Sequence, residues 1–362
     1  MKTITLIPGD GIGPEISEAM KRCVEAAGVQ IKWDEQQAGA MAYEKTGELL
    51  PRKTLDSIKK NKVAIKGPVT TPIGSGFRSV NVLLRKELDL YQNIRPARSF
   101  EGIPNSVQGV NLVIFRENTD DVYVGVEFEK GKKETLEIIK EIQKRNPAGE
   151  VIRDDSGISI KSISAFKSER IVKAAFEYAL KYKRKKVTCG HKANILKFSD
   201  GLFLERAQKI APSYPSVGFE DRIIDNLCMQ LVQRWWEYDI LVLPNLYGDI
   251  VSDLCAGLIG GLGVAPGANI GDAYAVFEAV HGSAPKYARK NKVNPTALIL
   301  SAVMMLRHIG EEKAAAKLEN AVAAVIKEGK NVTYDLKPKR DDPSAVGTRE
   351  MADAIIAKMK GG

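Results

Sequence analysis

The chain has 362 residues, of which 44% are hydrophobic and 27% charged, and this length fits about two domains, each able to bury its own core. No apolar run reaches the ~20 residues that a bilayer-spanning helix needs, and the N-terminal segment has no cleavable signal pattern. The four cysteines lack CxxC spacing, which is typical of reduced thiols. We therefore expect a soluble, cytoplasmic protein with no membrane partner.

The formal net charge is +9. A nucleic-acid-binding protein gathers its basic residues on one face, among aromatic side chains, whereas the lysines here are spread along the chain. The densest basic cluster, residues 181–186, ends a predicted helix, where cations meet the helix dipole favourably. We expect no nucleic-acid partner, since a polyanionic substrate and cofactor would account for the charge.

Strand-like and helix-like segments alternate along the chain. Strands are expected at 2–8, 62–68, 111–117, 186–192 and 239–246, and helices at 14–28, 80–88, 167–186, 248–261, 296–310 and 311–329. The first helix has Pro14 near its start and Gly28 at its end, as helix termini prefer. Residues 129–155 are highly charged and are typical of an inserted surface element. The alternation predicts an α/β fold with a largely parallel sheet.

The glycine-rich segment GDGIG at 9–13 follows the first predicted strand. Its spacing is GxGxG, not the GxGxxG of a Rossmann dinucleotide-binding fingerprint. We interpret it as a tight strand-to-helix turn, so a cofactor site must be sought elsewhere in the chain.

Two aspartates stand four residues apart in NLYGDIVSDLCAGLIGGLG at 245–263, and they share one face of a predicted helix. Like charges at that spacing cost a few tenths of a kcal/mol, so Asp249 and Asp253 need a compensating partner. Capping of the helix N-terminus would explain one aspartate. Ligation of a hard divalent cation such as Mg²⁺ or Mn²⁺ would explain both. From the pattern alone, the two interpretations are about equally good.

Arginines gather in another part of the sequence. Residues 78–99 and the strand that follows contribute Arg85, Arg95 and Arg116, and Tyr123 comes seven residues later. Arginines at strand and helix ends suit bidentate grips on several carboxylates, although each alone is more often a surface ion-pair partner. Lys192 stands just after a predicted strand, and residues 277–297 form a long Gly/Pro-punctuated loop of the kind that usually binds a ligand.

Together these segments resemble the β-decarboxylating dehydrogenases, the family of isocitrate, isopropylmalate and homoisocitrate dehydrogenases. The resemblance runs nearly end to end, through IPGDGIGPE, KGPVTTP, RENTDDVYVGVE, HKANI, NLYGDIVSD, VHGSAPKYA and VNPTALILSAVMMLRHIG. It implies an α/β fold distinct from the Rossmann fold, with a large domain (1–90 and 260–362), a small domain (91–120 and 165–259) and a clasp-like insertion (121–164). It also implies a homodimer whose two subunits share each active site.

The resemblance assigns roles to individual residues. Asp249 and Asp253 match metal ligands, and Asp225 matches a third ligand that the neighbouring subunit provides. Arg85, Arg95 and Arg116 match the arginines that hold substrate carboxylates. The implied chemistry is hydride transfer from C2 to a nicotinamide, followed by loss of CO₂ with the metal stabilising the enolate. Tyr123 would protonate the enolate, and Lys192, reaching in from the partner with Asp225, would handle the hydroxyl proton.

The substrate is expected to be isocitrate. Isopropylmalate enzymes place apolar residues near position 79, whereas this chain offers Ser79 and Asn81, which can hydrogen-bond a third carboxylate. Homoisocitrate is the alternative substrate. A non-catalytic regulatory subunit is a rival from another class, but every catalytic residue type is present. Some bacterial relatives are switched off by phosphorylation of the serine at this place, so Ser79 is a candidate site for a regulatory kinase.

The coenzyme is expected to be NADP, with NAD as the alternative. Lys286 and Tyr287 follow HGSAP, where NAD-using relatives tend to carry an acidic and then an apolar residue. Val293, Asn294 and Tyr334 also resemble the NADP type, and Arg234 matches an arginine reaching the 2′-phosphate from the partner. One departure is Pro338 in place of an arginine, where Lys337 or Lys339 could substitute as point charges. The remaining expected cofactor contacts are Thr70, His281, Gly282, Ser283, Ala284 and Asp335.

Overall fold

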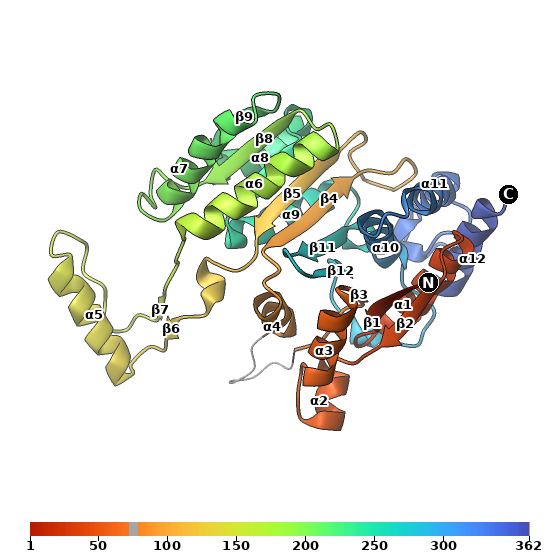
Figure 1. Ribbon diagram of the computed structural model, residues 1–362, viewed down its shortest axis with the longest axis horizontal. Helices are drawn as coiled ribbons and strands as arrows, with labels where there is room; N and C mark the ends of the chain where they lie inside the picture. Colours follow the sequence, from red (N-terminus) through yellow and green to blue (C-terminus); the bar gives the residue numbers. More distant parts are fainter. Residues whose placement is uncertain (72–78, 362) are drawn as a thin grey trace.

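The computed structural model describes residues 1–71 and 79–361, and its centre is one large mixed β-sheet (Figure 1). The sheet has ten strands in the order β2-β1-β3-β12-β11-β4-β5-β10-β8-β9. Their bounds are β1 (Lys2–Ile7), β2 (Ile31–Glu35), β3 (Val63–Lys66), β4 (Gln92–Arg98), β5 (Asn111–Glu117), β8 (Lys186–His191), β9 (Gly218–Ile223), β10 (Ile240–Leu243), β11 (Pro266–Ile270) and β12 (Ala275–Ala279). The strands at both sides of the sheet pair in parallel, while β12, β11, β4 and β5 pair antiparallel at its centre. The expected α/β fold with a predominantly parallel sheet is confirmed.

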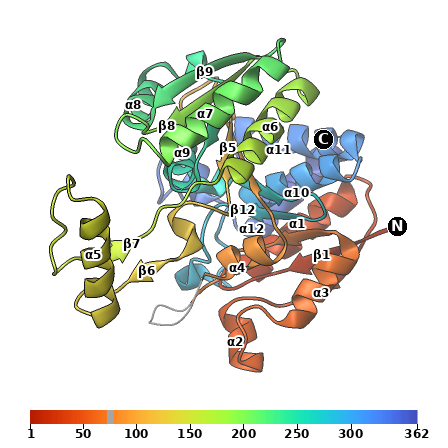
Figure 2. The same ribbon diagram turned by 60° about the vertical axis from the view of Figure 1, so that its left-hand side comes forward.

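Helices pack on both faces of this sheet (Figures 1 and 2). The helices of the described residues are α1 (Gly13–Ala26), α2 (Ala40–Thr46), α3 (Arg52–Asn61), α4 (Val80–Glu87), α5 (Lys133–Arg145), α6 (Ala165–Lys181), α7 (Asp200–Ile210), α8 (Ile224–Arg234), α9 (Asn245–Leu258), α10 (Thr296–His308), α11 (Glu312–Glu328) and α12 (Thr348–Met359). The strongly apolar α10 is buried along most of its length, since it lies between the sheet and α11. A helix buried on nearly all sides needs no polar face.

The two halves of the sheet come from different parts of the sequence. Strands β2, β1, β3, β12 and β11 use residues 2–66 and 266–279, whereas β4, β5, β10, β8 and β9 use residues 92–243. The halves join where β11 pairs with β4. The domain limits given above follow the same division, and as limits of independent domains they stay a prediction.

An arm extends from the body of the molecule between β5 and α6 (Figure 1). It contains the 3₁₀ turn η1 (Val122–Val124), helix α5 and the small antiparallel sheet of β6 (Glu127–Phe128) and β7 (Ile158–Ser159). Among the described residues, no helix is both long and apolar enough to cross a membrane. The four cysteines are free.

Three sequence expectations differ in detail from the structure. The helix expected from residue 248 begins at Asn245, one turn earlier. The helix expected at 167–186 ends at Lys181, so the basic residues that follow lie in the connection to β8. Strands β2, β4, β9, β11 and β12 were not anticipated.

Candidate active site

The pairing of β4 with β5 brings Arg95 and Arg116 together. Asn93 lies directly opposite Arg116 in this antiparallel pair, and Arg95 stands two residues further along β4. Because side chains alternate across a strand, all three project from one face of the sheet. The residues between them, Ile94 and Phe115, are buried on the other face. The polar and charged side chains therefore lie on one face of the sheet, and the apolar side chains that pack into the core lie on the other.

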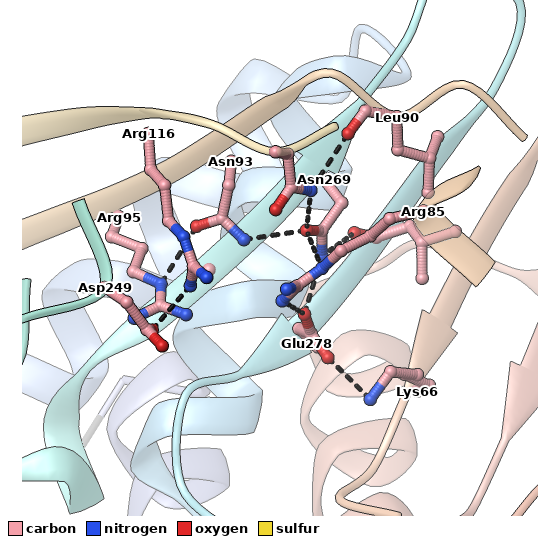
Figure 3. A network of polar contacts seen from close by, with 12 residues as sticks. Lys66, Arg85, Leu90, Asn93, Arg95, Arg116, Asp249, Asn269 and Glu278 are labelled. Atoms are coloured by element: carbon pink, nitrogen blue, oxygen red, sulfur yellow. Dashed lines mark hydrogen bonds and ion pairs between the residues drawn. The ribbon is translucent and has the colours of Figure 1, made fainter. Parts of the chain in front are cut away.

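Asp249 of α9 receives contacts from three of the predicted site residues, of which Figure 3 shows Arg95 and Arg116. Arg95 Nη1 lies 3.2 Å and Arg116 Nη1 2.5 Å from its Oδ1 atom, and the Tyr123 hydroxyl donates to its Oδ2 atom at 2.7 Å. Gly248 permits this approach, since a Cβ atom there would lie 2.5 Å from Arg116 Cγ. The structure therefore assembles residues that are up to 154 positions apart in sequence.

Asp253 stands one turn further along α9 and is more weakly held. Its Oδ1 atom is 3.5 Å from Arg95 Nη1, and more than half of its side chain is exposed. The N-cap residue of α9 is Pro244, so neither aspartate caps this helix and the capping alternative is wrong. Arg95 lies between the two carboxylates and offsets their repulsion.

Burial and neighbouring charge oppose each other in this cluster. Burial acts to raise the pKa of Asp249, but Arg116 and Arg95 outweigh it and leave that pKa below its ordinary value. Burial raises the pKa of Asp253. Burial, together with Arg85 and Arg95, lowers the pKa of Arg116 to about 9. The concentrated positive charge favours an anionic ligand.

Arg85 of α4 belongs to a second, fully buried network (Figure 3). Its Nη2 atom lies 3.2 Å from Glu278 Oε1, and Lys66 Nζ lies 2.5 Å from Glu278 Oε2. Asn269 Oδ1 accepts hydrogen bonds from Arg85 Nε and Asn93 Nδ2, at 3.1 and 2.7 Å. Although burial opposes ionisation, Lys66 and Arg85 hold the pKa of Glu278 far below its ordinary value. One carboxylate thereby fixes two cations beneath the site.

A small cavity lies between these networks, and one residue of its lining, Asn81, has an unpaired side-chain oxygen. The cavity measures about 120 Å³ and is lined by residues that include Asn81, Arg85, Arg95, His281 and Gly282. Asn81 Oδ1 and Arg116 Nη2 are buried and have no hydrogen-bond partner. Buried polar groups are normally satisfied, so unpaired atoms here favour a bound polar ligand. Ser79 is exposed and immediately precedes α4.

The predicted cofactor residues meet in a second region, beside the loop 281–288. Thr70 Oγ1 and Ser283 Oγ lie 2.6 Å apart, and Ala284 adopts a positive φ of 37°. The Lys286 ammonium lies 5.0 Å from the centre of the Tyr287 ring, whose own neighbour at 6.3 Å is the Tyr334 ring.

Asn294 and Lys337 were also expected near the cofactor. Asn294 Nδ2 donates to Asp335 Oδ2 at 3.0 Å. Lys337 does not meet the role expected of it, because its side chain is buried and donates to the carbonyls of Gly329 and Lys330 at 2.8 and 2.9 Å. That lysine is therefore not free to bind a phosphate, and Lys339 is the remaining flanking candidate.

The three residues expected to reach into the partner's site, Lys192, Asp225 and Arg234, also lie outside the Asp249 cluster. Lys192 pairs with Asp225 at 2.8 Å, and Arg234 lies 3.6 Å from Glu237 at the end of α8. Within one copy of the described chain, no group of three or more His, Cys, Asp or Glu residues is placed to hold a metal. One chain therefore supplies Asp249 and Asp253 together, but not Asp225 with them.

Several residues of the two networks were missed by sequence reasoning. Asn93, Asn245, Asn269, Glu278 and Lys66 all contact the predicted arginines or their partners. One usable signal was the lone carboxylate in the apolar strand AVFEA, because a buried charge must be paired. Another was the two-residue spacing of Asn93 and Arg95, which puts both on one face of a strand.

Comparisons with known proteins identify the family of this chain. Residues 3–355 match the family model described as isocitrate/isopropylmalate dehydrogenase. The chain is 43% identical to an NADP isocitrate dehydrogenase from Archaeoglobus fulgidus, over 99% of this chain and 92% of that protein. It is 47% identical to the alpha subunit of the mitochondrial NAD isocitrate dehydrogenase from Bos taurus, over 93% and 86%. The crystal structure of isocitrate dehydrogenase from Methylococcus capsulatus superimposes with a TM-score of 0.90 at 50% identity, covering 99% of this chain and all of that one.

These matches identify the protein as an enzyme, an oxidoreductase. The chain belongs to the isocitrate/isopropylmalate dehydrogenase family.

The buried Glu278 network yields a stability prediction. Glu278→Gln leaves Lys66 and Arg85 buried without their shared counter-charge, so the free energy of unfolding should fall by about 3–5 kcal/mol. Because the folded-state pKa of Glu278 is depressed, its stabilisation is complete above the ordinary pKa of 4.5 and is lost as the pH falls below it. Urea unfolding at several pH values measures both effects.

The matched control is Asp353→Asn, which removes a half-exposed partner of Arg22 and should cost less than about 1 kcal/mol. Equal losses for the two variants, or a Glu278→Gln effect that grows below pH 4.5, would contradict the assignment.

Proposed function

We propose that the protein oxidises and decarboxylates isocitrate to 2-oxoglutarate and CO₂, with hydride transfer to NADP and a requirement for Mg²⁺ or Mn²⁺. The observation that carries the proposal is the convergence of Arg95, Arg116 and Tyr123 on Asp249. Arg95 also lines a cavity whose lining includes the unpaired Asn81 Oδ1 atom. Arginines of this kind suit a substrate with several carboxylates.

The donor set fits a hard divalent cation. Asp249 and Asp253 offer carboxylate oxygens on one face of α9, and Asp253 is largely free, which is the ligand chemistry that Mg²⁺ and Mn²⁺ prefer. Asp225 of a second copy would complete the set. When bound, the cation would act as a Lewis acid on the substrate's C2 oxygen.

The chain's own residues would bind the substrate and move its protons. Arg85, Arg95 and Arg116 hold carboxylates and orient C2 toward the nicotinamide. Tyr123 serves as the proton donor to the enolate carbon: burial and the hydrogen bond to Asp249 raise its pKa, so it keeps its proton at neutral pH. Lys192, assisted by Asp225, accepts the hydroxyl proton in the partner's site.

The choice of isocitrate rests on Ser79 and Asn81. A hydroxyl and an amide at the start of α4 can bind the third carboxylate of isocitrate, and they would go unpaired against an isopropyl group. Homoisocitrate, which is one methylene longer, remains the alternative. Phosphorylation of Ser79 by a kinase stays a prediction, supported by the exposure of that side chain. A phosphate would put about −1.5 to −2 charges where a carboxylate must bind.

A homodimer is part of the proposal. Met229 and Val232 of α8 and Ile250 of α9 are 44%, 56% and 57% exposed, and these helices pack together. Exposed apolar side chains on adjoining helices favour association. A second copy at this face would bring Lys192, Asp225 and Arg234 toward its partner's site. Because the candidate catalytic residues are all present, we do not favour a non-catalytic regulatory subunit.

An initial-rate assay tests the proposed function. Isocitrate, homoisocitrate and isopropylmalate are each supplied with NADP or NAD, with Mg²⁺ and with a chelator. We expect kcat/KM to be highest for isocitrate with NADP and to collapse with the chelator. Preference for isopropylmalate, or turnover unaffected by chelation, would refute the proposal.

The coenzyme choice has its own test. Lys286, stacked over Tyr287, supplies a point charge for the 2′-phosphate, so Lys286→Asp with Tyr287→Ile should raise the KM for NADP at least about tenfold and shift preference toward NAD. Lys290→Asp, a nearby exposed lysine, is the control. If the wild-type kcat/KM is higher with NAD, the NADP assignment is wrong, and the family assignment stands.

A further inference from the structure

Asp121 occupies a backbone conformation that suits glycine. Its φ is 71° and its ψ is −159°, a region that side chains make costly. It directly precedes η1, the 3₁₀ turn that carries Tyr123, and it is fully buried. Since strain of this kind persists only where surrounding contacts enforce it, the contacts of Asp121 indicate what the strain maintains.

Those contacts join the Tyr123 turn to two other segments. Asp121 Oδ2 accepts from the backbone amide of Leu246 at 3.0 Å, in the first turn of the helix that carries Asp249. Asp121 Oδ1 accepts from the Val122 amide at 2.8 Å and pairs with Lys161 Nζ at 2.9 Å. The backbone amide of Asp121 donates to the Ser162 carbonyl at 2.8 Å. The turn is thus tied both to α9 and to the returning end of the arm.

Lys161 connects this turn with the second candidate catalytic segment. Its Nζ atom is also 3.4 Å from Oδ1 of Asp200, which is fully buried. Asp200 Oδ2 accepts from the backbone amide of Lys192 at 2.7 Å. The Tyr247 ring packs against the Lys161 ammonium, with its centre 4.9 Å away. One lysine therefore lies between two buried carboxylates, and each carboxylate holds a backbone segment bearing a candidate catalytic residue.

We propose that Lys161 is a positioning residue that holds the turns of Tyr123 and Lys192 together, through Asp121 and Asp200. The inference rests on the proposed function for its catalytic consequence. In the proposed dimer, Tyr123 serves its own subunit's site and Lys192 serves the partner's. The chain Asp121–Lys161–Asp200 would then couple the geometry of one active site to that of the other. Removal of the central cation leaves two adjacent buried carboxylates to repel one another, so both turns should loosen at once.

Hydrogen exchange of the dimer tests the positioning role without relying on turnover. In Lys161→Met the amides of Val122, Leu246 and Lys192 should exchange about tenfold faster or more, because their carboxylate acceptors lose their fixed position. Arg184→Met is the matched control. Arg184 pairs with Asp239 at 2.8 Å, and its side chain is about as buried as that of Lys161. This ion pair does not hold a segment that carries a candidate catalytic residue. Arg184→Met should leave those three amides unchanged. Unchanged exchange at both turns in Lys161→Met would overturn the proposal.

Kinetics test the catalytic consequence. Lys161→Met should lower kcat about tenfold or more with a smaller change in the KM for isocitrate, since small displacements of reacting groups are costly. In a Tyr123→Phe background the same change should lower kcat by a clearly smaller factor, because the two residues act together. Lys161→Arg, which keeps the cation, should recover part of the loss. An equal fold-loss of kcat in the wild-type and the Tyr123→Phe backgrounds would mean that Lys161 has only a structural role, and it would overturn the proposal.

The two proposals fail in distinguishable ways. A wild-type protein that does not oxidise isocitrate refutes the proposed function, while the exchange experiment still decides whether Lys161 holds both turns. Active wild-type enzyme with additive kinetics or unaltered exchange refutes the role of Lys161 alone. If Lys161→Met fails to fold, Asp121→Asn, which keeps the side chain's size and weakens the ion pair, undergoes the same measurements with the same expected and contrary results.

Discussion

The contact of Asp249 with Arg95 and Arg116 is the interaction on which the site depends. Both arginines are largely buried, with side chains 11% and 1% exposed, so their charges must be matched within the protein. The antiparallel pairing of β4 and β5 sets their positions, and Gly248 lets α9 lie directly upon Arg116. Tyr123 reaches the same carboxylate from the base of the arm. The sheet, a helix and the arm thus converge on one carboxylate.

The carboxylates of the site differ in how deeply they are buried and in how firmly they are paired with cations. Glu278 is committed to Lys66 and Arg85 and stays ionised, because those cations outweigh its burial. Asp249 is more open, with 39% of its side chain exposed, and Asp253 more so at 56%. A carboxylate that is partly solvated can exchange one partner for another at lower cost than a buried one. We interpret Glu278 as the fixed support of the arginines, and the two aspartates as groups that remain available to a ligand.

Much of the site could be predicted from the sequence, because motifs such as NLYGDIVSD and HGSAPKYA resemble one family closely. Two of the central antiparallel strands, β4 and β11, could not. β4 reads QNIRPAR and β11 reads PGANI, and neither has the apolar run or aliphatic alternation typical of a strand. Asn269 was missed for the same reason, since its contact with Asn93 depends on the β11–β4 pairing. Lys337 was misjudged because the sequence cannot show that two carbonyls bury its charge. The structure of one chain does not show which residues a second subunit would add to the site.

We propose above that Asp249 and Asp253 form a metal and substrate site completed across a dimer. Anomalous scattering from crystals grown with Mn²⁺ and isocitrate tests it most directly, because the signal locates the ion without any assumption about activity. We predict one peak per site, within about 2.0–2.6 Å of carboxylate oxygens from Asp249, Asp253 and Asp225 of a second subunit, with the substrate's carboxylates on the arginines. A peak elsewhere, or isocitrate bound with Mn²⁺ absent from both aspartates, would contradict the proposed metal and substrate site.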